Sequence, residues 1–105
     1  MYKLCFFVPV TDTDRVLSAV FAAGGGRIGN YDCCAWRVRG VGQFRPLPGS
    51  RPAQGECGRI ERVDEEKVEL VCSDTSLAAV LAALKSSHPY ETPAYEYWQV
   101  NEGGL

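Results

Sequence analysis

The chain of 105 residues lacks a surplus of positive charge, since 11 Lys and Arg face 13 Asp and Glu and the formal net charge is −2. Nucleic-acid binding draws most of its affinity from Lys and Arg placed against phosphates, so we expect no nucleic-acid partner. The sequence also lacks an apolar run long enough to span a bilayer and a basic segment before its first apolar stretch. We therefore expect a single cytoplasmic domain over residues 1–105, without a membrane partner.

Cysteine is present, but without the spacing of a disulfide framework or a zinc site. The five cysteines are an odd set, and no C-x-x-C occurs. Without an export signal, free thiols in a reducing compartment are the natural interpretation. Adjacent Cys33 and Cys34 on a strand would point to opposite faces, which disfavours a shared metal. We predict that Cys34 is a buried thiol on the same face as Trp36 and Val38.

Glycine is abundant at residues 24–29, where Gly24, Gly26 and Gly29 spell G-x-G-x-x-G. In a dinucleotide-binding fold this motif follows a strand and opens a helix, so that the pyrophosphate lies at the helix N-terminus. Here a predicted helix precedes the glycines and a predicted strand follows them. We therefore interpret the segment as the end of a helix and a tight entry into the next strand.

Alternation and helical spacing of apolar residues predict six elements. Strands are expected at 2–8, 31–40 and 95–100, helices at 13–23 and 73–87, and two strand runs flank Asp64–Glu66 as a hairpin or one bent strand. Ser73 or Asp74 is the expected cap of the second helix. A long Gly/Pro loop covers about 40–58, and 101–105 is a flexible tail. The order βαββαβ predicts an α+β, ferredoxin-like split βαβ fold, an antiparallel sheet with two helices on one face.

Both faces of this sheet carry aromatic side chains. Phe6 and Phe7 point apart in the first strand, and Tyr97 and Trp98 do so in the last. Helices cover one face, so apolar residues on the other need a second cover. Another copy of the chain is the favoured cover, and the 40–58 loop folded over the sheet is the alternative.

The segment HPYETP contains the one histidine. Two prolines stiffen it and present Tyr90 and Glu91 between a helix and a strand. His88 has three roles open to it: a ring bonded to the last carbonyls of the helix, a ligand with Glu91 for a divalent metal such as copper or zinc, or a general base. The acidic residues Glu61, Glu65 and Glu69 fall on one side of their strands, where we expect a solvated outer edge.

Three ordered motifs resemble a known family. They are G-R-I-G-N-Y-D-x-C, then G-Q-F-R-P-x-x-G-S-x-P-x-x-G, then H-P-Y-E-T-P-A-Y, and together they resemble the YqfO-type domain inserted in Nif-three-like (NGG-interacting factor) proteins. The last motif is also similar to one of CutA. The resemblance implies a PII/CutA-like fold and a homo-oligomer, a trimer above other states. Among the matching positions, it leaves Cys34, His88, Tyr90 and Glu91 as ligand candidates, with His88 and Glu91 as the metal candidates.

The favoured function is a non-catalytic binding or regulatory module. In this interpretation a divalent metal or a small ligand binds between subunits, where His88 and Glu91, with or without Cys34, approach the 40–58 loop. One alternative is a small enzyme with His88 as general base, although no nucleophile–base pair or cofactor motif accompanies it. The other is a purely structural subunit for protein interaction. Hydrolase activity of the parent family is not carried over, because its two-metal domain is missing here.

Overall fold

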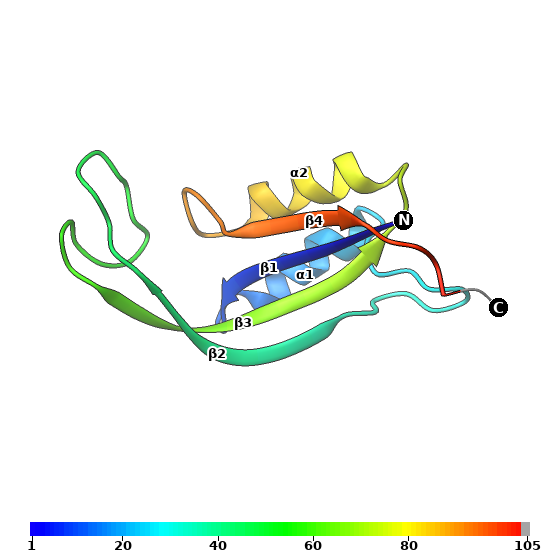
Figure 1. The fold of residues 1–105 in the computed structure, drawn as a ribbon, viewed down its shortest axis with the longest axis horizontal. Coiled ribbons are helices and arrows are strands. Elements are labelled where there is room, and N and C mark those ends of the chain that lie inside the picture. Colours follow the sequence, from blue (N-terminus) through cyan, green and yellow to red (C-terminus); the bar gives the residue numbers. More distant parts are fainter. Residues whose placement is uncertain (104–105) are drawn as a thin grey trace.

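A computed structural model describes residues 1–103 (Figure 1). Its elements are β1 (Tyr2–Pro9), α1 (Thr13–Ala22), β2 (Trp36–Phe44), β3 (Glu61–Cys72), α2 (Leu77–Ser87) and β4 (Tyr95–Gln99). The strands form one antiparallel sheet in the order β2-β3-β1-β4. The predicted α+β, ferredoxin-like fold is therefore confirmed. Of the predicted tail, residues 101–103 are exposed, and 104–105 lie outside the described residues.

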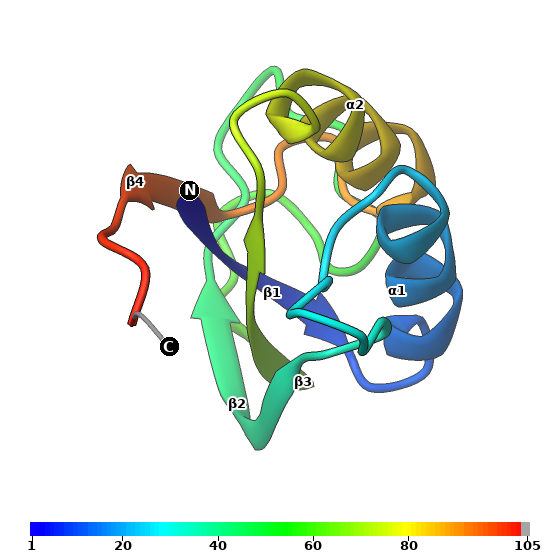
Figure 2. The ribbon, with the colours of Figure 1, turned by 90° about the vertical axis from the view of Figure 1, so that its right-hand side faces the viewer.

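Both helices lie side by side on one face of the sheet (Figure 2). The alternation of β1 buries Leu4, Phe6 and Val8 completely beneath them. Direct partners in an antiparallel sheet share a face, so Leu70 opposite Leu4 and Val68 opposite Phe6 complete the sheet side of the core. The predicted stripe of α2 packs on this layer, with Val80 and Leu84 wholly buried.

The glycines after α1 end the helix, as predicted. The amide of Gly25 donates to the Val20 carbonyl and that of Gly24 to the Phe21 carbonyl, both at 3.0 Å, which is the Schellman pattern. Gly24 has φ +109°, a left-handed conformation that costs glycine little. The amide of Gly26 then donates to the Val71 carbonyl at 2.8 Å. The segment is thus a helix end fixed against the sheet.

The second strand begins five residues later than predicted. Cys33 has φ +55°, and such a left-handed residue cannot continue a pleated strand. β2 starts at Trp36 and runs on to Phe44, so the loop behind it covers 45–60 rather than 40–58. The prediction that Cys34 is buried with Trp36 and Val38 is wrong for this chain, because Cys34 is half-buried while Trp36 and Val38 are exposed.

One alternative is settled, and two further local expectations need correction. Residues 61–72 form one continuous strand, which agrees with the prediction of a single strand and excludes the hairpin at Asp64–Glu66. That strand, β3, lies between β2 and β1 as far as Glu65, so Glu65 and Glu69 are not on an outer edge, whereas Glu61 lies where β3 pairs with β2 alone. α2 begins at Leu77 with Ser76 as its cap residue; the Ser73 hydroxyl accepts the Ser76 amide at 3.2 Å, in the turn before the helix.

The face of the sheet away from the helices, which we name the open face, exposes large apolar residues. Trp36, Val38 and Trp98 are 71%, 49% and 44% exposed. Their partners Glu69, Lys67 and Lys3 alternate with the buried core residues, which places all six on this face. The 45–60 loop extends beyond the sheet instead of covering it (Figure 1). Within residues 1–103 no helix has the length and apolarity to cross a membrane.

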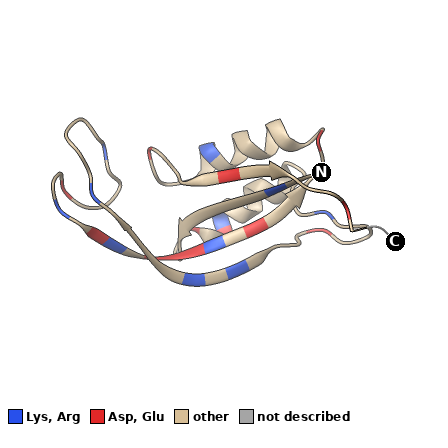
Figure 3. Ribbon diagram, in the orientation of Figure 1, with Lys and Arg blue, Asp and Glu red and all other residues tan. Residues whose placement is uncertain are grey.

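β2 and β3 continue past the end of β1, because the pairing of β1 with β3 stops at Glu65 while that of β2 with β3 reaches Glu61. We call this extension and its loop, residues 41–64, the arm. The arm gives the molecule an elongated shape of 50 × 24 × 23 Å. β2 carries only basic charges and β3 chiefly acidic ones (Figure 3). Arg37 on β2 binds both oxygens of Glu66 on β3 at 2.8 Å and so helps to hold β2 against β3.

Candidate functional site

A cavity of about 660 Å³ separates the arm from the turn at residues 88–94. We call it the arm cavity. Figure 1 shows the two segments from which most of its lining residues come, the green arm and the orange turn that faces it. It is lined by Phe7, Gly42, Gln43, Phe44, Arg45, Pro46, Leu47, Ser50, Pro52, Ala53, Glu65, Tyr90, Glu91, Thr92 and Ala94. Its walls therefore join two of the three sequence motifs, GQFRP and HPYETPA.

The turn begins where α2 is forced to end. The residue before a proline is disfavoured in helical conformation, and His88, before Pro89, has φ −72° and ψ 138°. Its amide still donates to the Leu84 carbonyl at 3.0 Å. The carbonyl of Ser87, left free at the helix end, accepts Arg15 from α1. Residues 89–92, which begin at the first of the two prolines, are bent, and the chain then reaches β4.

His88 is buried, with 7% of its surface exposed. Its Nε2 lies 2.7 Å from the Phe7 carbonyl oxygen, and its Nδ1 accepts the Tyr90 amide at 3.1 Å. A carbonyl can only accept, so Nε2 carries the proton and the ring is neutral. Burial lowers the pKa of His88 in agreement with this state. The ring ties the turn to β1 and does not bind the last carbonyls of the helix, which was one of the three roles open to it.

Tyr90 brings a hydroxyl to the carboxylate of Glu65 on β3. The hydroxyl donates to Glu65 Oε2 at 3.0 Å. Burial and the adjacent carboxylate raise the pKa of Tyr90, so the phenol keeps its proton and remains a donor. The Tyr90 ring also packs near Phe44, with 6.0 Å between ring centroids. Tyr90 thus joins the turn to both strands of the arm.

Glycine in β2 makes room for the Glu65 carboxylate. A Cβ atom at Gly42 would overlap the carboxyl group of Glu65, whereas one at Gly40, the direct partner of Glu65, would meet no atom within 4 Å. Gly42 therefore serves the cavity by lacking a side chain. Phe7 on β1 also lines the cavity.

Glu91 fastens the arm loop from the tip of the turn. Its Oε2 accepts the backbone amide of Arg51 at 2.9 Å. The loop is closed at its base by the Gly58 amide, which donates to the Pro46 carbonyl at 2.8 Å. Glu91 is exposed, so this contact lies at the rim of the cavity.

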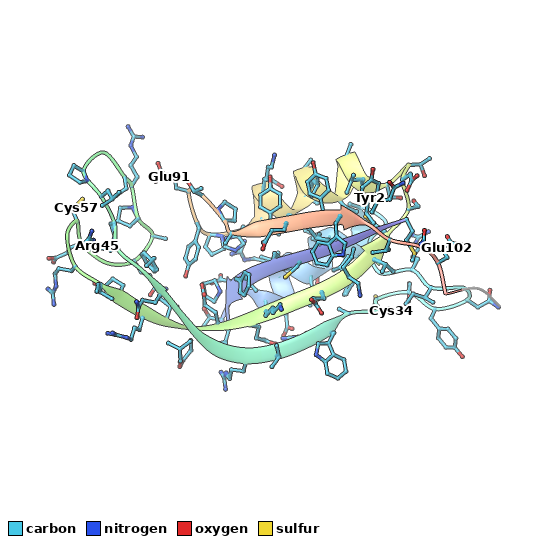
Figure 4. The ribbon with its side chains drawn as sticks, viewed as in Figure 1. Tyr2, Cys34, Arg45, Cys57, Glu91 and Glu102 are labelled. Carbon is cyan, nitrogen blue, oxygen red and sulfur yellow. The ribbon has the colours of Figure 1, made fainter. Side chains whose placement is uncertain are left out.

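The four candidate residues from the sequence do not all meet. Tyr90 and Glu91 line the arm cavity, and His88 lies behind it. Cys34 precedes β2, whose nine residues span roughly 30 Å, and Figure 4 places it at the opposite end of the molecule from Glu91. Cys34 is therefore not a third ligand beside His88 and Glu91 within one chain.

A metal bound by His88 finds no support in this geometry. Each ring nitrogen already has a protein partner, and a metal ligand needs a free nitrogen lone pair. In the part of the chain that the structure describes, no three His, Cys, Asp or Glu side chains gather in a way that could hold a metal ion.

Sequence reasoning missed Glu65, Phe44 and Arg45 as site residues. Glu65 was assigned to a solvated edge, yet it is half-buried and lines the cavity. Gly40 and Gly42, two residues apart in VRGVGQF, lie on one face of β2 and indicate a close approach of another group. The strand register is needed to show that this group is Glu65, the direct partner of Gly40.

Comparisons with known proteins agree with this fold. No protein-family model matches the chain. It is 47% identical over 94 residues to a "GTP cyclohydrolase 1 type 2 homolog" of Mycobacterium leprae, covering 90% of this chain and 24% of that protein. A protein of the same name from Halalkalibacterium halodurans is 44% identical over 104 residues, covering 98% and 28%. The chain thus spans about a quarter of the length of these curated relatives.

Solved structures extend the likeness. A Bacillus cereus protein related to NIF3 superposes with a TM-score of 0.82 at 35% identity, over 96% of this chain and 26% of that one. CutA1 of Pyrococcus horikoshii gives a TM-score of 0.70 at 17% identity, over 99% and 87%. A PII-like CutA of Nostoc gives 0.68 at 14%, over 96% and 82%, and these two show the fold alone. The resemblance predicted from the three motifs is confirmed.

Proposed function

We propose that this chain, a homologue of one segment of the Nif-three-like proteins, is a non-catalytic module that binds a small ligand in the arm cavity. One observation carries the proposal: a cavity of about 660 Å³ whose walls come from the two motifs around residues 42–53 and 88–94. Cavities of 300–1,000 Å³ with mainly apolar walls and a few polar groups are typical of small-molecule sites.

The construction of the cavity suits a binding and reporting role. His88 and Tyr90 fix the turn to β1 and β3. Across the mouth, the described residues provide a single hydrogen bond between turn and loop, from the Arg51 amide to Glu91. A ligand that contacts both walls would therefore order the loop, and an ordered loop could signal occupancy to a partner.

A catalytic role has less support. His88 would be the general base, but it is buried, does not line the cavity and uses both ring nitrogens within the fold. The cyclohydrolase in the name of the relatives refers to proteins of which this chain spans about a quarter. We propose no such activity for it.

Ligand-observed NMR with a library of small fragments tests the binding function. Ala94 lines the cavity, so Ala94→Trp should fill it and abolish the fragment signals obtained with the wild-type chain. Ala79→Trp, on the exposed side of α2, is the matched control and should keep them. Equal fragment binding by both variants would contradict a site in the arm cavity.

We also propose that the chain self-associates through the open face, as a trimer. Trp36, Val38 and Trp98 expose large apolar side chains on the open face, which the described chain leaves uncovered. Analytical ultracentrifugation should detect a trimer that Trp36→Lys dissociates. Tyr31→Lys is the control, because Tyr31 is 75% exposed but lies outside the sheet. A monomer in the wild type at micromolar concentration would overturn this assembly.

A further inference from the structure

The charges that line the arm cavity differ in depth. Arg45 and Glu91 are exposed and opposite in sign, whereas Glu65 is half-buried. Figure 4 labels Arg45 on the arm and Glu91 on the facing turn. Exposed charges are screened by water, while a charge in a less polar environment acts more strongly on its neighbours. Of the three charged groups that line the arm cavity, the Glu65 carboxylate therefore acts most strongly on a ligand inside it.

Glu65 on β3 has no cationic partner among the described residues, and in this it differs from two of the other carboxylates on that strand. Glu66 pairs with Arg37 at 2.8 Å and Glu69 with Lys67 at 3.8 Å, but no Lys or Arg nitrogen of residues 1–103 lies within 4 Å of Glu65. The hydroxyl of Tyr90 satisfies one carboxylate oxygen and leaves the charge uncompensated. Removing a carboxylate from water without a counter-charge costs free energy, and a cationic ligand would offset that cost.

Three aromatic residues line the same cavity as this carboxylate. Phe7, Phe44 and Tyr90 all line the cavity, and the planes of Phe44 and Tyr90 are tilted by 53°. The faces of aromatic rings attract ammonium groups within about 6 Å. Pro46 and Leu47 add an apolar wall on the loop side. Such a cavity could therefore bind both parts of a cationic ligand: the apolar part against the rings, Pro46 and Leu47, and the positive group beside Glu65.

We infer that the arm cavity selects a small organic cation: an amine whose ammonium group pairs with Glu65 and whose apolar or aromatic body lies against Phe7 and Phe44. This inference rests on the proposed small-ligand function and names the chemical class of the ligand. Its rival is an anionic ligand held by Arg45 at the rim.

Three probes with the same phenylethyl framework separate these classes. 2-Phenylethylamine is a cation, 2-phenylethanol is neutral and phenylacetate is an anion at pH 7. Each is titrated into the full ¹⁵N-labelled chain while the amide signals of residues 42–53 and 88–94 are followed. We expect the amine to bind about tenfold more tightly than the alcohol, as one charge-assisted hydrogen bond would give, and phenylacetate to bind weakest.

The variant Glu65→Gln isolates the charge, because the amide keeps the size of the side chain and can still accept the Tyr90 hydroxyl. It should lower the affinity for the amine to that for the alcohol. Glu69→Gln is the control, since Glu69 lies on the same face of β3 but does not line the cavity. It should preserve the tenfold preference. The comparison of the three probes with the wild-type chain does not depend on either variant folding.

The outcomes separate this inference from the function on which it rests. Equal affinity for the amine and the alcohol, or a preference for phenylacetate, overturns the inference and leaves a small-ligand site in place. A loss of preference in Glu69→Gln as large as that in Glu65→Gln overturns it also, because the effect would then come from general surface charge. No shift with any probe overturns the inference and counts against the binding function as well.

Discussion

The two ends of β2 have opposite characters. Before Trp36, residues 23–35 contain three glycines in a row and two adjacent cysteines, which are the residue types expected at phosphate or metal sites. After Phe44, the chain enters a loop rich in glycine and proline that has no phosphate-binding or metal-binding motif. Yet the first end is a helix stop and a turn, and the second forms one wall of the arm cavity. A cavity forms only where a second segment lies opposite the end of the strand. The turn at residues 88–94 lies opposite the second end and not the first.

Glycine serves a different purpose at each end. At Gly26 it permits φ +76° and a close approach to the Cys34 carbonyl. At Gly42 the missing Cβ leaves space for the Glu65 carboxylate. The first requirement concerns folding and the second concerns the site, so substitutions can separate the two ends.

Gly26→Ala should have the largest effect on stability. The left-handed conformation costs an alanine about 1–2 kcal/mol, and its Cβ would be forced against Phe21 and the Cys34 carbonyl, at a further cost of about 1–2 kcal/mol. The free energy of unfolding measured in urea should therefore fall by about 2–4 kcal/mol. Gly29 also has a positive φ, +56°, but an added Cβ there would meet no atom within 4 Å. Gly29→Ala should therefore lose only the conformational part, about 1–2 kcal/mol. Equal losses would mean that the close contact is unimportant.

Gly42→Ala should damage the other end. The added methyl group displaces the Glu65 carboxylate and breaks its hydrogen bond to Tyr90, which should cost about 1–3 kcal/mol of unfolding free energy and weaken fragment binding. Gly40→Ala, two residues away on the same face of β2, meets no atom and should be close to neutral. Normal fragment binding by Gly42→Ala would show that the arm cavity does not need a glycine at this position.

Protonation of His88 at low pH should lower the free energy of unfolding. Burial, the largest cause, lowers the pKa of His88 in the folded chain. The hydrogen bond to the Phe7 carbonyl and the charges of Glu65 and Asp12 oppose this shift, and Arg15 adds to it. The unfolded chain, with a histidine pKa near 6.5, therefore binds the proton more readily. The contribution of His88 to the free energy of unfolding should be complete above about pH 6.5 and decline as the pH falls towards the pKa in the folded chain.

The control is His88→Gln, which cannot titrate. The difference in unfolding free energy between the wild type and this variant should shrink between pH 7.5 and pH 5.5 in parallel urea titrations. A difference that stays constant or grows on acidification would contradict a buried neutral ring.

Metal titration should give the smallest effect. Because both ring nitrogens of His88 are occupied and Cys34 lies at the far end of β2, His88→Ala and Cys34→Ser should bind zinc or copper as weakly as the wild type in calorimetry. A clear loss of affinity in His88→Ala would restore His88 and Glu91 as a metal site formed with a neighbouring chain.

Local patterns were sufficient for much of the fold. The alternation of Leu4, Phe6 and Val8 and the stripe that includes Val80 and Leu84 predict the core, because each reflects a period within one element. The start of β2 was missed because a left-handed Cys33 leaves no mark in the sequence. Glu65 was missed because its partners come from Gly42 and Tyr90, which only the register of β3 and the turn bring together.

The most direct test is to locate bound fragments on the ¹⁵N-labelled chain by amide shift mapping. We expect the largest shifts within residues 42–53, at Glu65 and within 88–94, with residues 24–35 unchanged. Largest shifts within residues 24–35, or across the open face at Trp36 and Trp98, would contradict it.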